Sequence, residues 1–401
     1  MEWKRENSND LLAKWGLFLL SPVLGLFYSF LNLKTKSSFW VIYLVGLVFG
    51  LSLTVEAAWG NADVLWYADS MRHRADFEAW VGYDINYYLF QLATYFTGQG
   101  EKDIYAFTLE FLVSRFTNNY HVFFLVVAAI YGFFSIKSLK LFVAERKFDN
   151  SILCLIVVYI FLSAQILEIN GVRFFTGGWI AVYSLLQIFI NKKKRYFLLL
   201  ALTPLVHNAF FLFLAIVFVF YVAKRWPTIC FIFFIISFAL SEVFAQILST
   251  NVSLLPEFMA KSTEYYLNAE NASRGLLYSI FDVSRRVFIN ILVVVVIITA
   301  KFHESKTETK DMYLFVVILA AFSNFFMSVP IFGSRMQALM FPFLAYVWLV
   351  NIYKTKRGKI MYLYPVVSFY FIFFLMPRTY YRLLEPCFFY SSPIYLIFKY
   401  L

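Results

Sequence analysis

Residues 152–190 read ILCLIVVYIFLSAQILEINGVRFFTGGWIAVYSLLQIFI, which is two apolar runs, 152–169 and 172–190, with almost no loop between them. Because a bilayer core about 30 Å thick needs roughly 20 apolar residues per helix, each run is long enough to cross a membrane. The glycine at the junction favours a tight turn. This stretch therefore predicts two consecutive membrane-spanning helices.

The same pattern extends over the whole chain. Hydrophobic residues make up 61% of the 401 residues and charged residues only 15%, whereas an ordinary soluble domain carries about 25% charged residues. Further apolar segments lie at 15–33, 39–58, 121–136, 196–223, 228–248, 286–300, 312–329, 336–353 and 360–376. We predict an all-α polytopic membrane protein, with one transmembrane domain over 1–401 and two outer polar segments, 59–120 and 249–285.

The net charge of +11 has a distribution typical of membrane loops. Lysine-rich clusters separate the apolar runs, at residues 34–36, 137–147, 192–195, 224–225, 301–310 and 354–359. Lysine and arginine are enriched in the cytoplasmic loops of membrane proteins, so we assign these clusters to the inner side. This distribution argues against nucleic acid as the partner of the basic residues.

With these clusters inside, successive loops alternate between the inner and outer sides of the membrane, and two segments do not fit this alternation. Segment 196–223 has basic clusters at both ends, and as one helix of about 42 Å it would place one cluster outside. We favour a re-entrant hairpin with its apex at residues 203–208, and a single long helix is the alternative. Segment 15–33 has the same character, because basic residues flank it and Ser21-Pro22 interrupts it.

This orientation places an unexpected set of arginines on the outer side. They are Arg72, Arg74, Arg115, Arg173, Arg274, Arg285, Arg286, Arg335, Arg378 and Arg382. The planar guanidinium binds phosphate through several hydrogen bonds, whereas lysine acts as a point charge, so the set favours a phosphate-containing ligand. The alternative is that these arginines pair with outer acids, such as Asp69, Asp84, Glu168 and Asp282.

Two of the predicted outer turns share a Gly-x-Arg pattern, ending in Arg173 and Arg335. Each is expected at the start of a helix running inwards, where the arginine would add its donors to the free N–H groups of the helix N-terminus. Arg285-Arg286 stands in a similar position before segment 286–300. Together these helix starts predict a diphosphate-binding site.

His207 lies in the middle of the longest apolar run. An ionisable residue at membrane depth is a functional candidate, and a neutral imidazole can accept a proton from a hydroxyl nucleophile. The alternative is a structural histidine hydrogen-bonded to a neighbouring helix.

The outer segment 59–120 is rich in aromatic and acidic residues. Trp66, Tyr67, Asp84 and Tyr87 are candidates for sugar binding, since sugar C–H faces stack on rings and hydroxyls need hydrogen bonds; an interfacial aromatic belt is the alternative. Within this segment, residues 103–120 show helical spacing of apolar residues and are expected to lie along the membrane surface. No metal-ligand spacing or cofactor fingerprint appears, so neither a metal nor a cofactor is expected.

These features resemble the EpsG-like branch of the Wzy-type polysaccharide polymerases of bacteria. The resemblance covers about residues 40–350 and rests on Tyr67 and Asp69, the stretch from Asp103 to Arg115 and Val122, Gly171-Val-Arg173, His207 and Arg335. The chain has Asn208-Ala209 where members of the family often have a serine after the histidine.

The resemblance implies a GT-C-like bundle of about 10–12 transmembrane or re-entrant helices in the bacterial cytoplasmic membrane. It implies transfer of a growing glycan from an undecaprenyl diphosphate carrier onto the next lipid-linked repeat unit, at the outer face and without a metal. Arg173 and Arg335 would bind the diphosphate, with Arg285 and Arg286 as weaker candidates. His207 would be the base, with Asp69 in reserve.

The implied partners are the lipid-linked oligosaccharide donor and acceptor, membrane lipid and a chain-length regulator protein. Three alternatives stay open: a glycan ligase using the same lipid carrier, a flippase or transporter of the lipid-linked unit, and a membrane acyltransferase that decorates polysaccharide. The sequence shows no convincing internal repeat beyond the two Gly-x-Arg turns, and this counts against a transporter.

Overall fold

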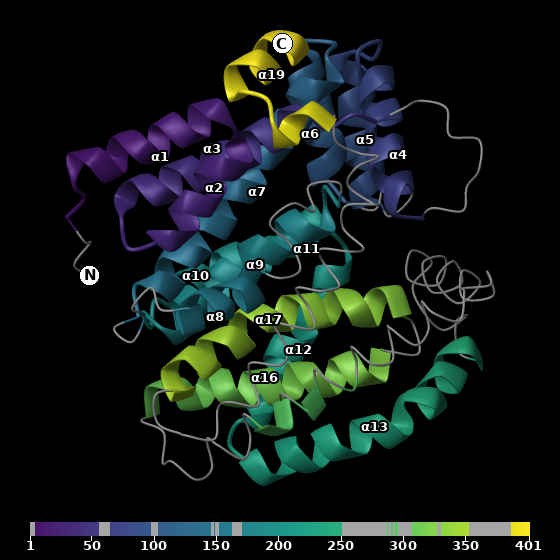
Figure 1. Cartoon of the computed structure of the whole chain (residues 1–401). Helices are drawn as coiled ribbons and strands as arrows, with labels where there is room; N and C mark the ends of the chain where they lie inside the picture. The colour runs from purple at the N-terminus through teal and green to yellow at the C-terminus, as the bar shows by residue number, and fades with distance from the viewer. Residues whose placement is uncertain are drawn as a thin grey trace. The chain divides into compact units, whose positions relative to one another are not determined.

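The structure is a computed structural model that describes residues 5–55, 65–97, 103–145, 148, 152–162, 171–250, 287, 290–291, 293–295, 307–326, 330–352 and 386–401. In these ranges all the elements are helices, which confirms the all-α class (Figure 1). The predicted outer segment 249–285 lies outside the described residues except at its start.

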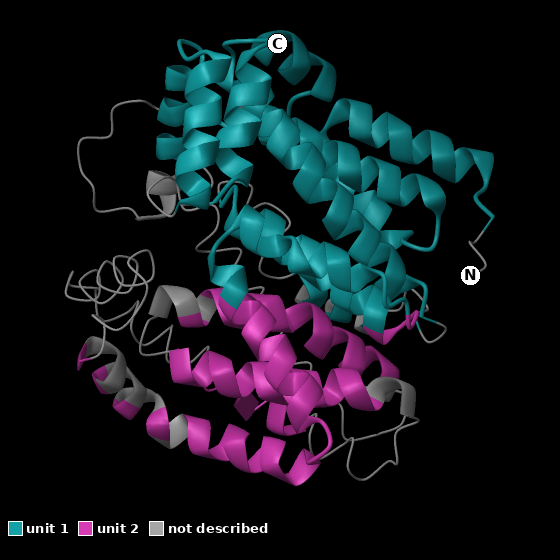
Figure 2. Cartoon of the chain, turned by 180° about the vertical axis from the view of Figure 1, so that it is seen from behind, with its two compact units in different colours: residues 1–188, 193–211, 365–401 teal, residues 189–192, 212–364 magenta. Residues whose placement is uncertain are grey.

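The chain divides into two compact units (Figure 2). Unit 1 comprises Met1–Ile188, Lys193–Phe211 and Pro365–Leu401, and unit 2 comprises Phe189–Lys192 and Leu212–Tyr364. The single transmembrane domain stays a prediction.

The helices of unit 1 are α1 (Ser8–Leu20), α2 (Pro22–Leu31), α3 (Lys36–Leu51), α4 (Leu65–Trp80), α5 (Ile85–Phe96), α6 (Tyr105–Ser114), α7 (Tyr120–Val143), α8 (Ile152–Leu162), α9 (Phe174–Phe189, except its last residue), α10 (Tyr196–Ala201), α11 (Thr203–Val206), the short 3-10 helix η4 (Pro386–Phe389) and α19 (Pro393–Tyr400). Helix α12 (Ala209–Ala223) begins in unit 1 and continues into unit 2, which also contains α13 (Pro227–Thr250), α16 (Thr307–Phe325) and α17 (Pro330–Ile352).

The centre of unit 1 is the packing of α3 along α7. Gly50 makes this close approach feasible, since a Cβ there would stand 2.5 Å from the Ala128 side chain and 2.6 Å from the Phe124 carbonyl oxygen. Helix α7 is long and apolar enough to cross a membrane, and within the described residues the other apolar helices fall short of that test.

Segment 15–33 is interrupted where the sequence analysis expects it. Helix α1 ends at Leu20, Ser21 is extended, and Pro22 begins α2, which packs back against α1. The buried ammonium of Lys14 donates to Thr35 Oγ1 at 2.8 Å and Ser37 Oγ at 2.6 Å, and also pairs with Glu6. The two flanks of this segment therefore meet, as a hairpin requires.

Segment 196–223 is also broken near its predicted apex. Helix α10 ends at Ala201 and α11 at Val206. His207 then adopts an extended backbone, and α12 begins at Ala209. Pro204 begins no new long helix but forms part of the four-residue α11. This non-helical stretch places the imidazole of His207 at a helix junction rather than along a continuous helix face.

Unit 2 contains a buried polar network inside otherwise apolar helices. The Asn290 and Asn324 side-chain amides donate to each other at 3.0 Å, and Asn324 Nδ2 also donates to Ser237 Oγ at 3.1 Å. Such amide pairs fix the register of packed helices, because an unpaired buried amide costs free energy.

Candidate functional site

Arg173 stands immediately before α9 and forms a buried ion pair. Its Nη1 donates to Asp103 Oδ2 at 2.9 Å, and the two side chains are 13% and 2% exposed. Arg173 is thus at a helix start, as the Gly-x-Arg pattern predicts. Asp103 is not among the predicted site residues, although it begins the stretch 103–115 on which the family resemblance partly rests.

Gly171 has a packing role in the same turn. A Cβ at this position would collide with the ring of Phe175. The glycine therefore permits a close approach within the turn before α9.

The Asp103–Arg173 pair lies in the same helix cluster as His207. The Ile104 N–H, next to Asp103, donates to the Leu205 carbonyl oxygen at 3.1 Å, which ties the start of α6 to α11. The ring of Phe174, next to Arg173, meets the imidazole of His207 edge-on with centroids 5.5 Å apart. Three separate chain segments therefore converge in unit 1.

The hydrogen bond of His207 defines the tautomer of its neutral imidazole. Its Nδ1 accepts from the Ala209 N–H at 3.1 Å, capping the first turn of α12. A ring nitrogen that accepts a hydrogen bond carries no proton, so in neutral His207 the proton is on Nε2. In this tautomer Nε2 is the ring nitrogen that can donate a hydrogen bond.

Tyr105 adds a buried hydroxyl near Asp103 and Thr176. Burial, the largest cause, raises the pKa of the Tyr105 hydroxyl, and the neighbouring Asp103 carboxylate raises it further, against a lowering by Thr176. The phenol therefore keeps its proton at neutral pH and can act only as a neutral group.

The other predicted diphosphate ligands are placed differently. Arg335 is half-buried in the second turn of α17, which begins at Pro330, so the expectation that it opens its helix is wrong. The helix begins earlier because Pro330, whose φ suits a first helical residue, precedes the glycine. Arg285 and Arg286 lie outside the described residues.

Pairing with acids accounts for other outer arginines. Arg72 Nε is 3.9 Å from Asp76, and Arg74 Nε donates to Glu78 at 2.8 Å. Both are i,i+4 pairs within α4, and exposed pairs of this kind contribute little stability. Arg74 is the more enclosed of the two arginines and also donates to the Val55 carbonyl oxygen. The pair made by Arg173 differs because it is buried and joins two elements, although its acid is none of those expected.

The predicted sugar-binding residues are only partly described. Trp66, Tyr67 and Asp69 belong to α4, and their side chains lie outside the described part of the structure. The Asp84 carboxylate caps α5, accepting from the Tyr87 N–H at 2.9 Å; this bond lowers the pKa of Asp84. The Tyr87 ring packs against Tyr83 with centroids 4.1 Å apart and ring planes tilted by 32°. The cap explains Asp84 locally, and its sugar role stays a prediction.

Helix α6 within segment 103–120 is confirmed, but it is more enclosed than a surface helix. It packs against α4, α7 and α11 and buries residues on most of its circumference, including Glu110. A helix lying on a membrane would bury one face only.

Comparison with known proteins gives one match. Residues 64–392 match the model of the EpsG family, which is well over half of the chain. No curated protein and no solved structure shows a significant match to the chain.

Proposed function

This chain belongs to the EpsG family, which associates it with polysaccharide biosynthesis at a membrane, and from that premise we propose that it polymerises lipid-linked oligosaccharide repeat units. The donor is a glycan on undecaprenyl diphosphate, and the reaction takes place at the outer face of the bacterial cytoplasmic membrane. The fold proposed for this activity is a polytopic GT-C-like bundle, with a chain-length regulator as a further partner.

The proposed reaction is glycosyl transfer with lipid diphosphate as the leaving group. A hydroxyl oxygen of the acceptor unit attacks the anomeric carbon of the donor glycan and forms the new glycosidic bond. The bond from that carbon to the diphosphate oxygen breaks, and its electron pair leaves with the diphosphate. The hydroxyl proton goes to a base. Negative charge thus develops on the diphosphate, where guanidinium groups stabilise it most in the transition state.

The observation that carries this proposal is the buried Asp103–Arg173 ion pair beside His207. Asp103 accepts one of the five N–H donors of the guanidinium. An arginine held in this way is oriented before the substrate arrives, so little rotamer freedom is lost on binding. Arg173 would therefore present its guanidinium to diphosphate oxygens in a fixed direction.

The protonation of His207 supports a donor role rather than the base role expected from the sequence. Its Nε2–H would donate a hydrogen bond to the departing diphosphate, while Nδ1 holds the start of α12. The base is then Asp69, the reserve candidate. Both assignments are part of the proposal.

Two substitutions of His207 separate its two nitrogens. Asparagine places Oδ1 near the position of Nδ1 and is a good helix cap, whereas glutamine places an amide N–H near the position of Nε2. We expect His207→Asn to lower the polymerisation rate about 100-fold and His207→Gln to lower it by less than about 10-fold. The rate is measured as product formed from lipid-linked units.

The two variants also distinguish the other roles of this residue. Equal, near-complete loss in both would restore the base role to His207. Full activity of His207→Asn would mean that His207 only caps α12.

The proposed function is tested with purified protein in detergent and lipid-linked repeat units as the sole substrate. A ladder of lipid-linked products of increasing length is the expected result. A product transferred only when a different acceptor is supplied would indicate a ligase. Absence of any new glycosidic bond, with movement of the unit across a vesicle membrane, would indicate a flippase.

A further inference from the structure

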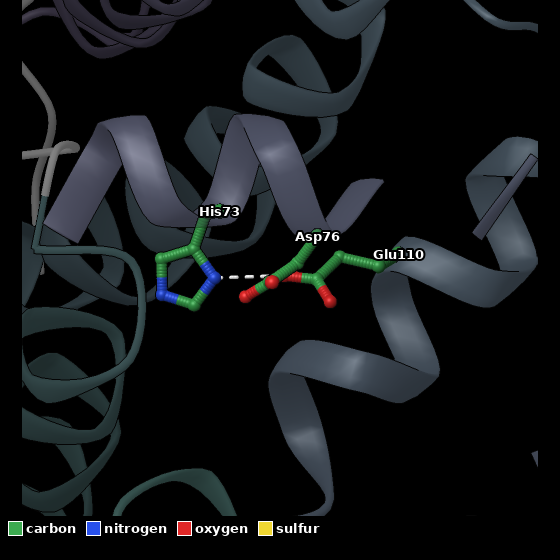
Figure 3. A group of neighbouring side chains, drawn as sticks. All are labelled: His73, Asp76 and Glu110. Atoms are coloured by element: carbon green, nitrogen blue, oxygen red, sulfur yellow. Dashed lines mark hydrogen bonds and ion pairs between the residues drawn. The ribbon is translucent and has the colours of Figure 1, made fainter. Parts of the chain in front are cut away.

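A second cluster of polar side chains joins α4 to α6 in unit 1. His73 and Asp76 lie one turn apart on α4, and Glu110 reaches them from α6 (Figure 3). His73 Nδ1 is 2.7 Å from Glu110 Oε1, and one nitrogen or oxygen atom from each of the three residues lies within 4.8 Å of the others.

Burial makes this cluster unusual. The side chains of His73 and Glu110 are 2% and 3% exposed, and Glu110 is the one acid of the apolar helix α6, YAFTLEFLVS. An ionised carboxylate in such a place has to be compensated by opposite charge and hydrogen bonds. A protonated His73 would supply one positive charge, whereas a divalent cation would compensate both Glu110 and Asp76.

The donor set selects a class of cation. One imidazole nitrogen and two carboxylate groups suit Zn²⁺ and similar first-row divalent ions, whereas Mg²⁺ and Ca²⁺ prefer oxygen donors alone. Ligand atoms about 2.0–2.1 Å from Zn²⁺ stand about 3.4 Å apart at a tetrahedral angle. The His73–Glu110 contact of 2.7 Å therefore has to open by less than about 1 Å.

Asp76 is placed to complete the set. It is about half exposed, and its pair with Arg72 has an N–O distance of 3.9 Å, the long end for an ion pair. Its ligand oxygen already lies within 4.8 Å of the ligand atoms of His73 and Glu110, so a small movement brings it to coordination distance. A water molecule would fill the fourth position.

We propose that His73, Asp76 and Glu110 bind one divalent transition-metal cation of the Zn²⁺ class, which clamps α4 to α6. The sequence showed no metal-ligand spacing here, and Glu110 joins His73 and Asp76 from a different helix. The cation is structural and is separate from the proposed diphosphate chemistry. Since Asp103 stands just before α6, the clamp also holds the segment that orients Arg173.

Metal content tests the site directly on the full-length protein. Purified protein in detergent is treated with chelator, loaded with Zn²⁺, freed of excess ion and analysed by mass spectrometry of the element. We expect about one Zn²⁺ per chain in the wild type, and less than a tenth of that in Glu110→Gln and in His73→Asn. Glu78→Gln is the matched control, since Glu78 is an exposed acid on the same helix, and it should retain the metal.

A measurement on the wild type alone keeps the proposal testable if the variants fold poorly. Co²⁺ bound by nitrogen and oxygen ligands in a four-coordinate site gives visible absorption bands, which Zn²⁺ should abolish by displacement. Zn²⁺ should also raise the thermal unfolding temperature of chelator-treated protein. No retained metal and no cobalt bands in the wild type, or equal metal in Glu110→Gln, would overturn the site and leave a hydrogen-bonded His73–Glu110 pair. None of these readouts depends on polymerase activity.

Discussion

Replacing Arg173 with lysine is expected to abolish long-chain glycan and to lower the polymerisation rate at least about 100-fold. Lysine keeps the positive charge and can still pair with Asp103, but it lacks the planar fork that binds several phosphate oxygens at once. Alanine is less informative, because removing one partner of a buried ion pair costs about 3–5 kcal/mol of stability. The measurement is the length distribution of glycan in cells that express each variant, together with the rate of the purified enzyme.

Two controls separate a catalytic from a structural role of this pair. Arg72→Lys changes an exposed outer arginine in the same way and should leave the ladder normal. The double exchange Asp103→Arg with Arg173→Asp preserves opposite charges at the two positions but moves the guanidinium. We expect this exchange to recover folding relative to either single reversal, without recovering polymerisation. Recovery of both, or a normal ladder in Arg173→Lys, would contradict contact with the diphosphate.

The second large effect is expected at Arg335. This half-buried arginine lies on α17 in unit 2. Lysine at this position keeps the charge but, as at Arg173, loses the bidentate geometry for phosphate. We expect Arg335→Lys to eliminate the long products and to lower the rate by about 100-fold, the scale for loss of one donor to a developing oxyanion. The products are separated by size after reaction of purified protein with lipid-linked units.

The matched control for Arg335 is Arg225→Lys, an exposed arginine of the same unit, which should be fully active. An Arg335→Lys enzyme with a wild-type rate and product length would remove Arg335 from the proposed site. Loss of activity together with loss of the folded protein in detergent would instead assign it a structural role.

The helices and their breaks were largely predictable. Hydropathy runs and charge clusters depend only on neighbouring residues, so they identify apolar helices without any knowledge of packing. The same holds for the interruption at Ser21-Pro22 and for the break that begins after Val206, which local backbone chemistry decides. The Gly-x-Arg pattern located Arg173 at a helix start, although it failed for Arg335 because Pro330 begins that helix earlier.

The partners of the charged residues were not predictable in this way. Asp103 and Arg173 are 70 residues apart in the chain, and His73 and Glu110 are 37 apart. The sequence offered several acids as partners for the arginines. Asp103, the acid that pairs with Arg173, was not among those expected. Which acid is chosen depends on how α4, α6, α9 and α11 pack.

By itself, then, the sequence determined the helical class seen over the described residues, two of the places where its helices break, and the family to which the chain belongs. Only the tertiary structure decided that Asp103 pairs with Arg173, that His207 Nδ1 accepts from the Ala209 N–H, and that Glu110 is buried against His73. Helix formation depends on interactions within a few residues, whereas pairing a buried charge depends on which distant side chain the packing brings within hydrogen-bond distance.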